Sequence, residues 1–240
     1  MSSSPHIQTD LIIDVGAHNG DDTAYYLQRG FRVVAIEANP ALAQAITTRF
    51  REQVASGTLT VLNVGISAAP GRQPFWVSED NSVLSSFDRH LVERHGGRSH
   101  RIDVECVPFA DVLRQHGIPY YLKVDIEGFD RVCLDALEPA ACPAYVSCEV
   151  AHVGGVIEHL HAIGYRSFKL VNQSTYTEAT PVFDHEIGFR ALRRLCRVVP
   201  GLRHVLPDGV RAEFDTLAEQ QRYVFPHGSS GPFGEDTHGQ

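Results

Sequence analysis

Three charged side chains alternate along one predicted strand, in the stretch YYLKVDIEGFD (120–130). Lys123, Asp125 and Glu127 share one face for as long as the chain stays extended, because successive side chains of a strand point to opposite faces. A buried parallel strand is expected to be apolar on both faces, and buried charges are rare unless paired or functional. A carboxylate here can act as a general base, and a lysine can stabilise a developing alkoxide. We rank Asp125 first as candidate base; the alternative is a structural Lys123–Asp125 pair with a solvated Glu127.

Two further candidates come at the end of the next predicted strand, AYVSCEV (144–150). Glu149 ends this strand and His152 follows it, so both side chains can reach the crevice expected beside Asp125. His152, Glu149 and Glu127 are the alternative bases, although a hydrogen-bonded structural role is the competing interpretation for His152. Asp125 and Glu149 could jointly hold a divalent ion such as Mg²⁺, which prefers oxygen ligands. Two ligands are too few to assign a metal.

A glycine-rich loop, DVGAHNGDDT (14–23), comes at the end of the first apolar run. Ligands of open α/β sheets bind at the carboxyl ends of the strands, so this loop is expected at the site. It lacks the middle glycine of a dinucleotide-binding fingerprint, and Asp14, Asp21 and Asp22 would repel a phosphate. A cationic ligand without phosphate, S-adenosylmethionine, fits the acidic loop better. For Asp21 and Asp22 the alternative is that they stabilise the start of the following helix.

Two more strand ends are expected to contact the same ligand. Glu37, in IEANP, follows Gly16 by 21 residues, about the offset at which an acid meets a ribose diol in nucleotide-binding folds. This pair is shared by nicotinamide and adenosylmethionine enzymes, and the acidic loop favours the second. Gly65, Ile66 and Ser67, in NVGIS, would lie beside the adenine, although this stretch is also an ordinary strand exit.

The elements that must position these residues are apolar runs alternating with helical patterns. The expected strands are LIIDV (11–15), FRVVAIEA (31–38), LTVLNVGI (59–66), YYLKVDI (120–126), AYVSCEV (144–150), SFKLVN (167–172) and RYVFP (222–226). A further β-rich run, RIDVECVPF, precedes a short helix, and ALAQAITTRFREQVASG is expected to be a helix that stops at Gly57. Strands that are apolar on both faces and separated by helices indicate an α/β fold, a doubly wound, mostly parallel seven-stranded sheet.

Two polar stretches, 78–101 and 174–221, interrupt the alternation within a single expected domain, 1–240, whose residues 1–9 are a flexible N-terminus. Each is a candidate lid or substrate-recognition insertion, or an ordinary surface insertion. The second contains a segment, 187–207, that is free of carboxylates and holds Arg190, Arg193, Arg194, Arg197 and Arg203. These arginines could recruit an acceptor bearing phosphate or carboxylate. The alternative is a solvated helix face or a contact with a partner subunit.

Composition limits the class of protein. The net charge of −8 over 240 residues argues against a general nucleic-acid surface. No apolar run approaches the roughly 20 residues of a membrane span, and no secretory signal is expected at the N-terminus. The five cysteines, without C-x-x-C, indicate reduced thiols in a cytoplasmic protein and no zinc framework. The oligomeric state stays open.

The motifs D-V-G-A-x-x-G, I-E-A-N-P, N-V-G-I-S and K-V-D-I-E-G-F-D together resemble the FkbM-type methyltransferases, a branch of the Rossmann-like class I adenosylmethionine-dependent fold. SSGPFGEDT (229–237) resembles a segment found late in that family, whereas 174–221 has little of the family pattern. The resemblance implies S-adenosylmethionine as cofactor and methylation of a hydroxyl on a sugar or other small-molecule natural product. It places Asp125 near the methyl group. The expected cofactor contacts are Asp14, Gly16, Ala17, His18, Asn19, Gly20, Glu37, Ala38, Gly65, Ile66, Ser67 and Asp125.

Three functions remain open from sequence alone: an O-methyltransferase, a nicotinamide-dependent oxidoreductase, and a catalytically silent module that binds S-adenosylmethionine. The missing glycine and the acidic loop disfavour the second. The charged strand at 120–130 disfavours the third.

Overall fold

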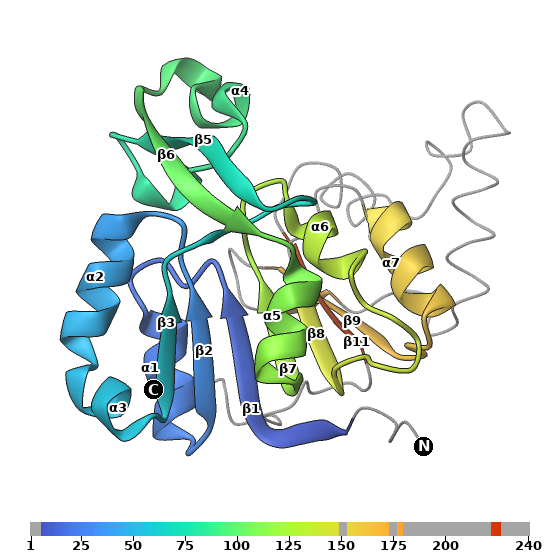
Figure 1. Ribbon diagram of the computed structural model, residues 1–240. Coiled ribbons are helices and arrows are strands. Elements are labelled where there is room, and N and C mark those ends of the chain that lie inside the picture. Colours follow the sequence, from blue (N-terminus) through green and yellow to red (C-terminus); the bar gives the residue numbers. More distant parts are fainter. Residues whose placement is uncertain (1–5, 149–152, 173–176, 180–221, 227–240) are drawn as a thin grey trace, which may run out of the picture.

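A computed structural model describes residues 6–148, 153–172, 177–179 and 222–226, which form a layered α/β structure (Figure 1). Its centre is a five-stranded, all-parallel sheet of order β3-β2-β1-β7-β8. The strands are β1 (Ile7–Val15), β2 (Arg32–Ile36), β3 (Leu59–Leu62), β7 (Ile118–Val124) and β8 (Tyr145–Cys148). The chain winds in one direction from β1 to β3 and in the other from β7 to β8. The point where the order reverses, between β1 and β7, is where such sheets bind ligands.

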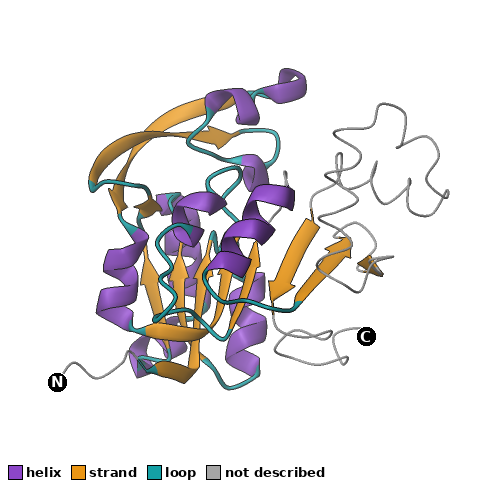
Figure 2. Cartoon of the chain, turned by 90° about the vertical axis from the view of Figure 1, so that its right-hand side faces the viewer, coloured by secondary structure: helices purple, strands orange, loops and turns teal. Residues whose placement is uncertain are grey.

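Helices cover both faces of this sheet, as the two views show (Figures 1 and 2). They are α1 (Asp21–Gln28), α2 (Pro40–Arg49), α3 (Arg51–Ser56), α5 (Phe109–His116), α6 (Asp130–Leu134) and α7 (Val153–Ala162). Strand β1 shows why two layers form. Leu11 and Ile13 are buried in one hydrophobic cluster and Ile12 is buried in the other, on the opposite face. The expected doubly wound, mostly parallel sheet is confirmed.

A second sheet stands over the carboxyl ends of β1, β2 and β3 (Figure 1). It has the order β4-β6-β5, with β4 (Gly65–Ile66), β5 (Gly71–Ser78) and β6 (Ser99–Val107), and β5 and β6 form an antiparallel hairpin. The connection between β5 and β6 carries η1 (Ser82–Leu84), α4 (Arg89–Val92) and η2 (Arg94–Gly96). We call residues 71–107 the hairpin unit. The β-rich run RIDVECVPF therefore lies outside the main sheet.

The single strand expected at 59–66 is wrong, because the chain leaves the main sheet after Leu62. Asn63 follows, and its side-chain amide donates to the carbonyl oxygens of Glu37 (2.8 Å) and Ala38 (3.2 Å). The amide thus bonds the backbone beyond the end of β2 while the chain turns toward β4. The same run of residues supplies two strands in two sheets, and both end near Glu37.

The last strands also differ from a simple seven-stranded sheet. β9 (Phe168–Asn172), β10 (Thr177–Ala179) and β11 (Arg222–Pro226) form an antiparallel sheet of order β10-β9-β11. β11 lies beside β8, so this small sheet continues the main one in space without being part of its hydrogen-bonded ladder. Strands are therefore present at 168–172 and 222–226 as expected, but the expected seven-stranded sheet is not confirmed, because the main sheet of the described residues has five strands.

The helix expected from Ala41 onward is interrupted, because Phe50 departs from helical geometry (φ −113°, ψ 35°) between α2 and α3. Its ring is buried with Ile46 against the position of Gly20. The stop at Gly57 is confirmed by its left-handed φ of +76°. In the described part of the chain no helix is long and apolar enough to cross a membrane, and the four described cysteines are free thiols.

Candidate functional site

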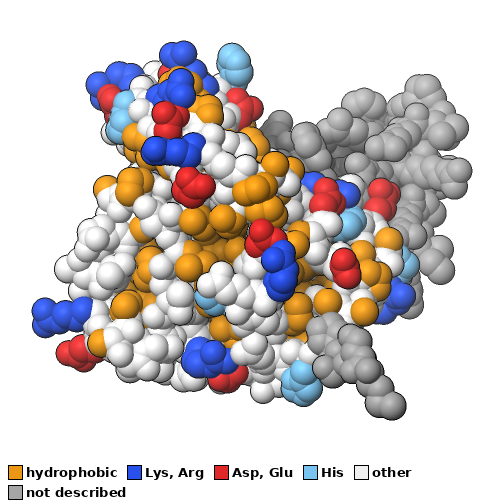
Figure 3. Space-filling view, viewed as in Figure 1, with side chains coloured by type: hydrophobic (Ala, Val, Ile, Leu, Met, Phe, Trp, Pro, Cys, Tyr) orange, Lys and Arg blue, Asp and Glu red, His pale blue; other side chains and the backbone are white. Residues whose placement is uncertain are grey.

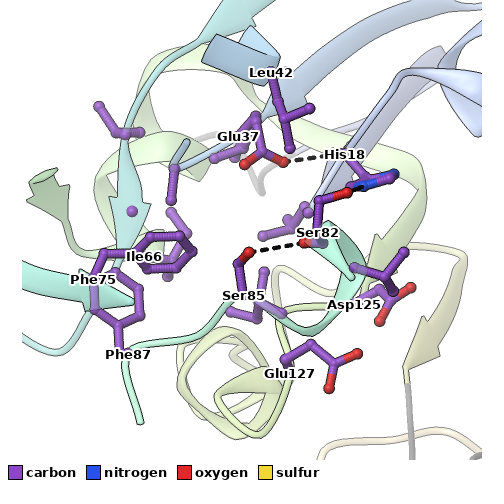
Figure 4. Close-up of a pocket in the computed structure, with 18 residues that line it drawn as sticks. His18, Glu37, Leu42, Ile66, Phe75, Ser82, Ser85, Phe87, Asp125 and Glu127 are labelled. Carbon is purple, nitrogen blue, oxygen red and sulfur yellow. Dashed lines mark hydrogen bonds between the residues drawn. The ribbon is translucent and has the colours of Figure 1, made fainter. Parts of the chain in front are cut away.

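A pocket of about 540 Å³, open to solvent, lies at the carboxyl ends of β1, β2 and β7 beneath the hairpin unit (Figure 4). Its lining combines a polar loop side with an apolar end. The lining residues are Val15, Gly16, His18, Ile36, Glu37, Ala38, Leu42, Val64, Gly65, Ile66, Phe75, Ser82, Val83, Ser85, Phe87, Asp125, Ile126 and Glu127.

Gly16 lies where the first loop passes the exit of β7. Its φ is +80°, and a Cβ there would come within 1.9 Å of the Asp125 carbonyl oxygen. Only glycine fits this conformation and this approach. The backbone N–H groups of Gly16 and Ala17 both donate to Ile36 O (2.9 and 3.0 Å). The glycine thus lets three strand ends meet, which brings the expected cofactor loop against Asp125.

Glu37 is buried at the end of β2, and its carboxylate faces the pocket. Its two oxygens accept hydrogen bonds from His18 N (2.9 Å) and Asn39 N (2.8 Å). Burial raises the pKa of Glu37 to about 7, although both backbone donors act in the opposite direction. A carboxylate has about four lone-pair sites, so two remain for a ligand diol.

Lys123 lies beneath the glycine loop rather than in the pocket wall, with only 7% of its side chain exposed. Its Nζ donates to Gly16 O (3.0 Å) and lies 3.3 Å from Asp14, 3.4 Å from Asp22 and 3.7 Å from Asp125. The ammonium group therefore links β1, α1 and the exit of β7. The lysine thereby holds the glycine loop beside Asp125.

Each aspartate of the glycine loop has a cationic neighbour within the protein. Lys123 lies beside Asp14 and Asp22, and Asp21 forms an exposed ion pair with Arg49 at 2.7 Å. Asp14 is completely buried, accepts a hydrogen bond from Thr23 (2.7 Å), and has its pKa raised by burial. The expectation that the aspartates of this loop attract a cationic ligand is therefore wrong, because the loop does not present three free carboxylates to the pocket. The carboxylates that face it are on other strand ends.

Asp125 and Glu127 are those carboxylates at the end of β7. The expectation that Glu127 continues an extended face is wrong, because β7 ends at Val124 and Glu127 has a left-handed φ of +42°. The turn nevertheless brings Glu127 to the same side of the pocket as Asp125 (Figure 4). Burial, together with the charge of Asp125, raises the pKa of Glu127 and of the neighbouring Asp130 to about 7.

The raised pKa of Asp130 predicts a pH-dependent stability. Between its ordinary value of 3.8 and about 7, the folded protein binds more protons at Asp130 than the unfolded chain, so this residue's contribution to stability falls as pH rises. Asp130→Asn removes that titration. The unfolding free energy of the variant minus that of the wild type should therefore increase by about 1–3 kcal/mol as the pH rises from about 4.5 to about 7.5. Urea unfolding of both proteins measures this difference; a pH-independent difference would show that Asp130 is ionised throughout.

The hairpin unit contributes pocket residues that the sequence did not single out. Ser82, Val83, Ser85 and Phe87 come from the expected 78–101 insertion, and Phe75 comes from β5. The His18 ring nitrogen Nε2 lies 2.8 Å from Ser82 Oγ, which connects the glycine loop to this unit. The insertion's polarity indicated a loop, but no local pattern showed that it would fold over the strand ends.

An apolar end of the pocket is built from the same unit. Phe75 and Phe87 pack edge to face with ring centroids 5.0 Å apart, and Ile66 lines the pocket beside them (Figure 4). Gly65 permits this packing, because a Cβ there would lie 2.4 Å from the Phe87 ring. Ile66 and Gly65 were expected next to adenine, and they lie at this apolar end.

Several expected site residues are not among the residues that line the pocket. Ala17 is buried, Asn19 accepts a hydrogen bond from Asp21 N (3.1 Å), and Ser67 donates to Ala69 O (2.6 Å). Gly20 precedes α1 in a left-handed conformation. Glu149, His152 and the arginines of 187–207 lie outside the described residues. Within the described ranges, no group of three metal-ligating side chains has the geometry to hold a metal ion.

Comparison with known proteins gives one family. Residues 14–173 match the model of the methyltransferase FkbM domain. A search of curated proteins found no match.

Solved structures resemble the chain distantly. Precorrin-6y C5,15-methyltransferase from Geobacter metallireducens GS-15 is 12% identical, with 95% of this chain and 85% of that chain covered and a TM-score of 0.41. StiE O-MT (residues 961–1257) is 12% identical over 94% of this chain and 69% of that one, with a TM-score of 0.42. Haemonchus contortus phosphoethanolamine N-methyltransferase 2, in complex with S-adenosyl-L-methionine, is 11% identical over 92% and 49%, with a TM-score of 0.39. These likenesses are too distant to assign a residue, ligand or substrate to this chain.

Proposed function

The chain belongs to the methyltransferase FkbM family, and on that premise we propose that it is an S-adenosylmethionine-dependent O-methyltransferase. Its acceptor is a hydroxyl group on a sugar or another small-molecule natural product. The observation that carries this proposal is the pocket at the switch point of the sheet, with Glu37 on its wall and an apolar end beside it.

The pocket's two ends suit the two halves of an adenosine. Glu37 has free lone pairs for the ribose diol, next to the backbone of the glycine loop. Ile66, Phe75 and Phe87 offer an apolar, aromatic surface to the adenine. The pocket is lined by carboxylates and by no lysine or arginine of the described chain, which favours a ligand that carries positive charge. This supports S-adenosylmethionine over a dinucleotide with a pyrophosphate.

Asp125 is the residue we assign to proton removal. When bound, S-adenosylmethionine supplies an activated methyl group on a sulfonium. The Asp125 carboxylate, which lines the pocket and is 23% exposed, would accept the proton of the acceptor hydroxyl while the methyl group passes from sulfur to that oxygen and S-adenosylhomocysteine is left. Lys123 holds the exit of β7 and the glycine loop in fixed positions, so that the acceptor oxygen and the carboxylate are aligned.

Calorimetry with S-adenosylmethionine and with NAD tests the cofactor. We expect the first to bind and the second not to bind. Glu37→Ala should weaken S-adenosylmethionine binding by about 1–3 kcal/mol, or roughly 5- to 150-fold, because the ribose hydroxyls lose a buried partner. The matched control is Glu52→Ala, an exposed glutamate on α3, which should bind like the wild type.

Binding of NAD without S-adenosylmethionine would restore the oxidoreductase alternative. A folded Glu37→Ala variant with unchanged affinity would show that Glu37 does not hold the ribose. A silent binding module differs from the enzyme only in turnover, so a screen of acceptors with a labelled methyl donor separates these two functions.

A further inference from the structure

The pocket has an uneven distribution of charge. Asp125 and Glu127 lie together on one side, apart from the Phe75 and Phe87 end (Figure 4). Among the described lining residues no lysine or arginine faces them. On the face shown by the space-filling view, hydrophobic side chains gather where the hairpin unit meets the main sheet, and many of the Lys, Arg and His side chains are on the outer part of that unit (Figure 3). On this side the pocket surface is therefore formed by the carboxylates of Asp125 and Glu127, with Lys123 outside the lining at 3.7 Å from Asp125.

Glu127 differs from Glu37 and Asp14 in that no described residue donates a hydrogen bond to its carboxylate, and Arg94 acts on it only through its charge. It is 8% exposed and lines the pocket, yet within the described chain no hydrogen bond or ion pair reaches its carboxylate. Glu37 has two backbone donors and Asp14 has Thr23 and Lys123. A buried polar group without a partner is costly unless something else supplies the missing hydrogen bond. The open side of this carboxylate is the pocket.

The backbone holds Glu127 in this place at a cost. Its left-handed φ of +42° is unfavourable for a residue with a side chain. Ser86 Oγ donates a buried hydrogen bond to Glu127 O (2.8 Å). Gly128, with φ +89°, allows Leu91 of α4 to pack closely, since a Cβ there would lie 2.7 Å from the Leu91 side chain. The hairpin unit thus fixes the turn that presents Glu127.

We propose that Glu127 is an acceptor-binding residue, whose carboxylate receives a hydrogen bond from a hydroxyl or ammonium group of the methyl acceptor beside Asp125. The reacting end of the acceptor is then neutral or cationic and rich in donors, a polyol or an amino alcohol, and phosphate or carboxylate is excluded there by like-charge repulsion. An anionic group farther along the acceptor would still agree with the role predicted for the arginines of 187–207, which is to bind phosphate or carboxylate. This inference rests on the proposed function, because it places the methyl group next to Asp125.

Analogues of S-adenosylhomocysteine test this without a known acceptor. A nitrogen replaces the sulfur and carries a 2-aminoethyl, 2-hydroxyethyl or carboxymethyl arm, so that each arm probes the space for the reacting group. Calorimetry on the wild type at about pH 8.5, above the pKa of about 7 of Glu127, should show the carboxymethyl analogue binding at least about tenfold more weakly than the aminoethyl analogue. In Glu127→Gln this ratio should fall to about threefold or less, with S-adenosylhomocysteine itself bound as in the wild type. Glu79→Gln, an exposed glutamate of the hairpin unit paired with Arg98, should keep the wild-type ratio.

The two proposals fail in different ways. If S-adenosylhomocysteine does not bind the wild type, the proposed function is overturned and the inference with it. If it binds, but the carboxymethyl arm is accepted as well as the aminoethyl arm, or Glu127→Gln retains the full discrimination, the role of Glu127 is overturned alone. The melting temperature of each variant shows that the comparison is made on folded protein.

Discussion

Lys123→Met is expected to lower the free energy of unfolding by about 3–5 kcal/mol, the scale measured when one partner of a buried ion pair is removed. Asp14 is completely buried, and its Oδ1 accepts no hydrogen bond in the described chain, so its charge depends on the ammonium group 3.3 Å away. Methionine keeps much of the volume of lysine but removes that charge. It also removes the donor to Gly16 O.

Urea unfolding of the variants measures this effect, with Arg49→Met as the matched control. Arg49 pairs with Asp21 of the same loop, but both side chains are largely exposed, so its loss should cost much less stability than the loss of Lys123. Adding Asp14→Asn to Lys123→Met should restore part of the stability, because the orphaned buried charge is then absent. Equal stabilities of Lys123→Met and wild type would mean that Lys123 does not serve as the counter-charge of Asp14.

The main sheet was predictable because its signal is local. Strands such as β1 and β2 are apolar on both faces, and this pattern alone indicates a parallel sheet covered by helices. The position of Glu37 at the pocket was also predictable, since the end of β2 and its offset from Gly16 are both visible in the sequence, and its contact with a ribose stays a prediction. Burial of its carboxylate and its place in the pocket wall agree with that expectation.

The remaining parts of the site depend on contacts between distant segments. Ser82 and Phe87 reach the pocket only because β5 and β6 pair into a hairpin over the strand ends, and long-range antiparallel pairing leaves no mark near those residues. The expectation that the glycine loop presents free carboxylates to the ligand was wrong for the same reason. Asp14, Asp21 and Asp22 are adjacent in sequence to nothing cationic, and their counter-charges Lys123 and Arg49 come from distant elements.

The turn after β7 departs from the alternation of side chains that the sequence predicts. Alternation predicts that Lys123, Asp125 and Glu127 share one face, but Lys123 turns under the glycine loop and Glu127 leaves the strand geometry. Asp125 is the member of this set that lies between them, close to the lysine and in the pocket wall. Its catalytic role remains a prediction, and its substitution gives the second large expected effect.

Asp125→Asn should lower kcat by about 10²-fold or more, the scale of a lost general base. Asparagine has nearly the same shape, but its neutral amide cannot take the proton of the acceptor hydroxyl. Because Glu37 and the apolar end are untouched, affinity for S-adenosylmethionine should stay within a few-fold of wild type. Single-turnover assays with an acceptor found by the labelled-methyl screen separate the chemical step from product release.

The control for this substitution is Asp103→Asn, an exposed aspartate of β6 that pairs with Arg101 and should leave kcat unchanged. A loss in Asp125→Asn that appears in kcat rather than in KM for either substrate indicates an interaction made in the transition state. A loss in KM alone would make Asp125 a binding residue. If kcat stays within a few-fold of wild type, the proton is taken elsewhere, and His152 and Glu149, which come after the neighbouring strand β8, become the residues to replace next.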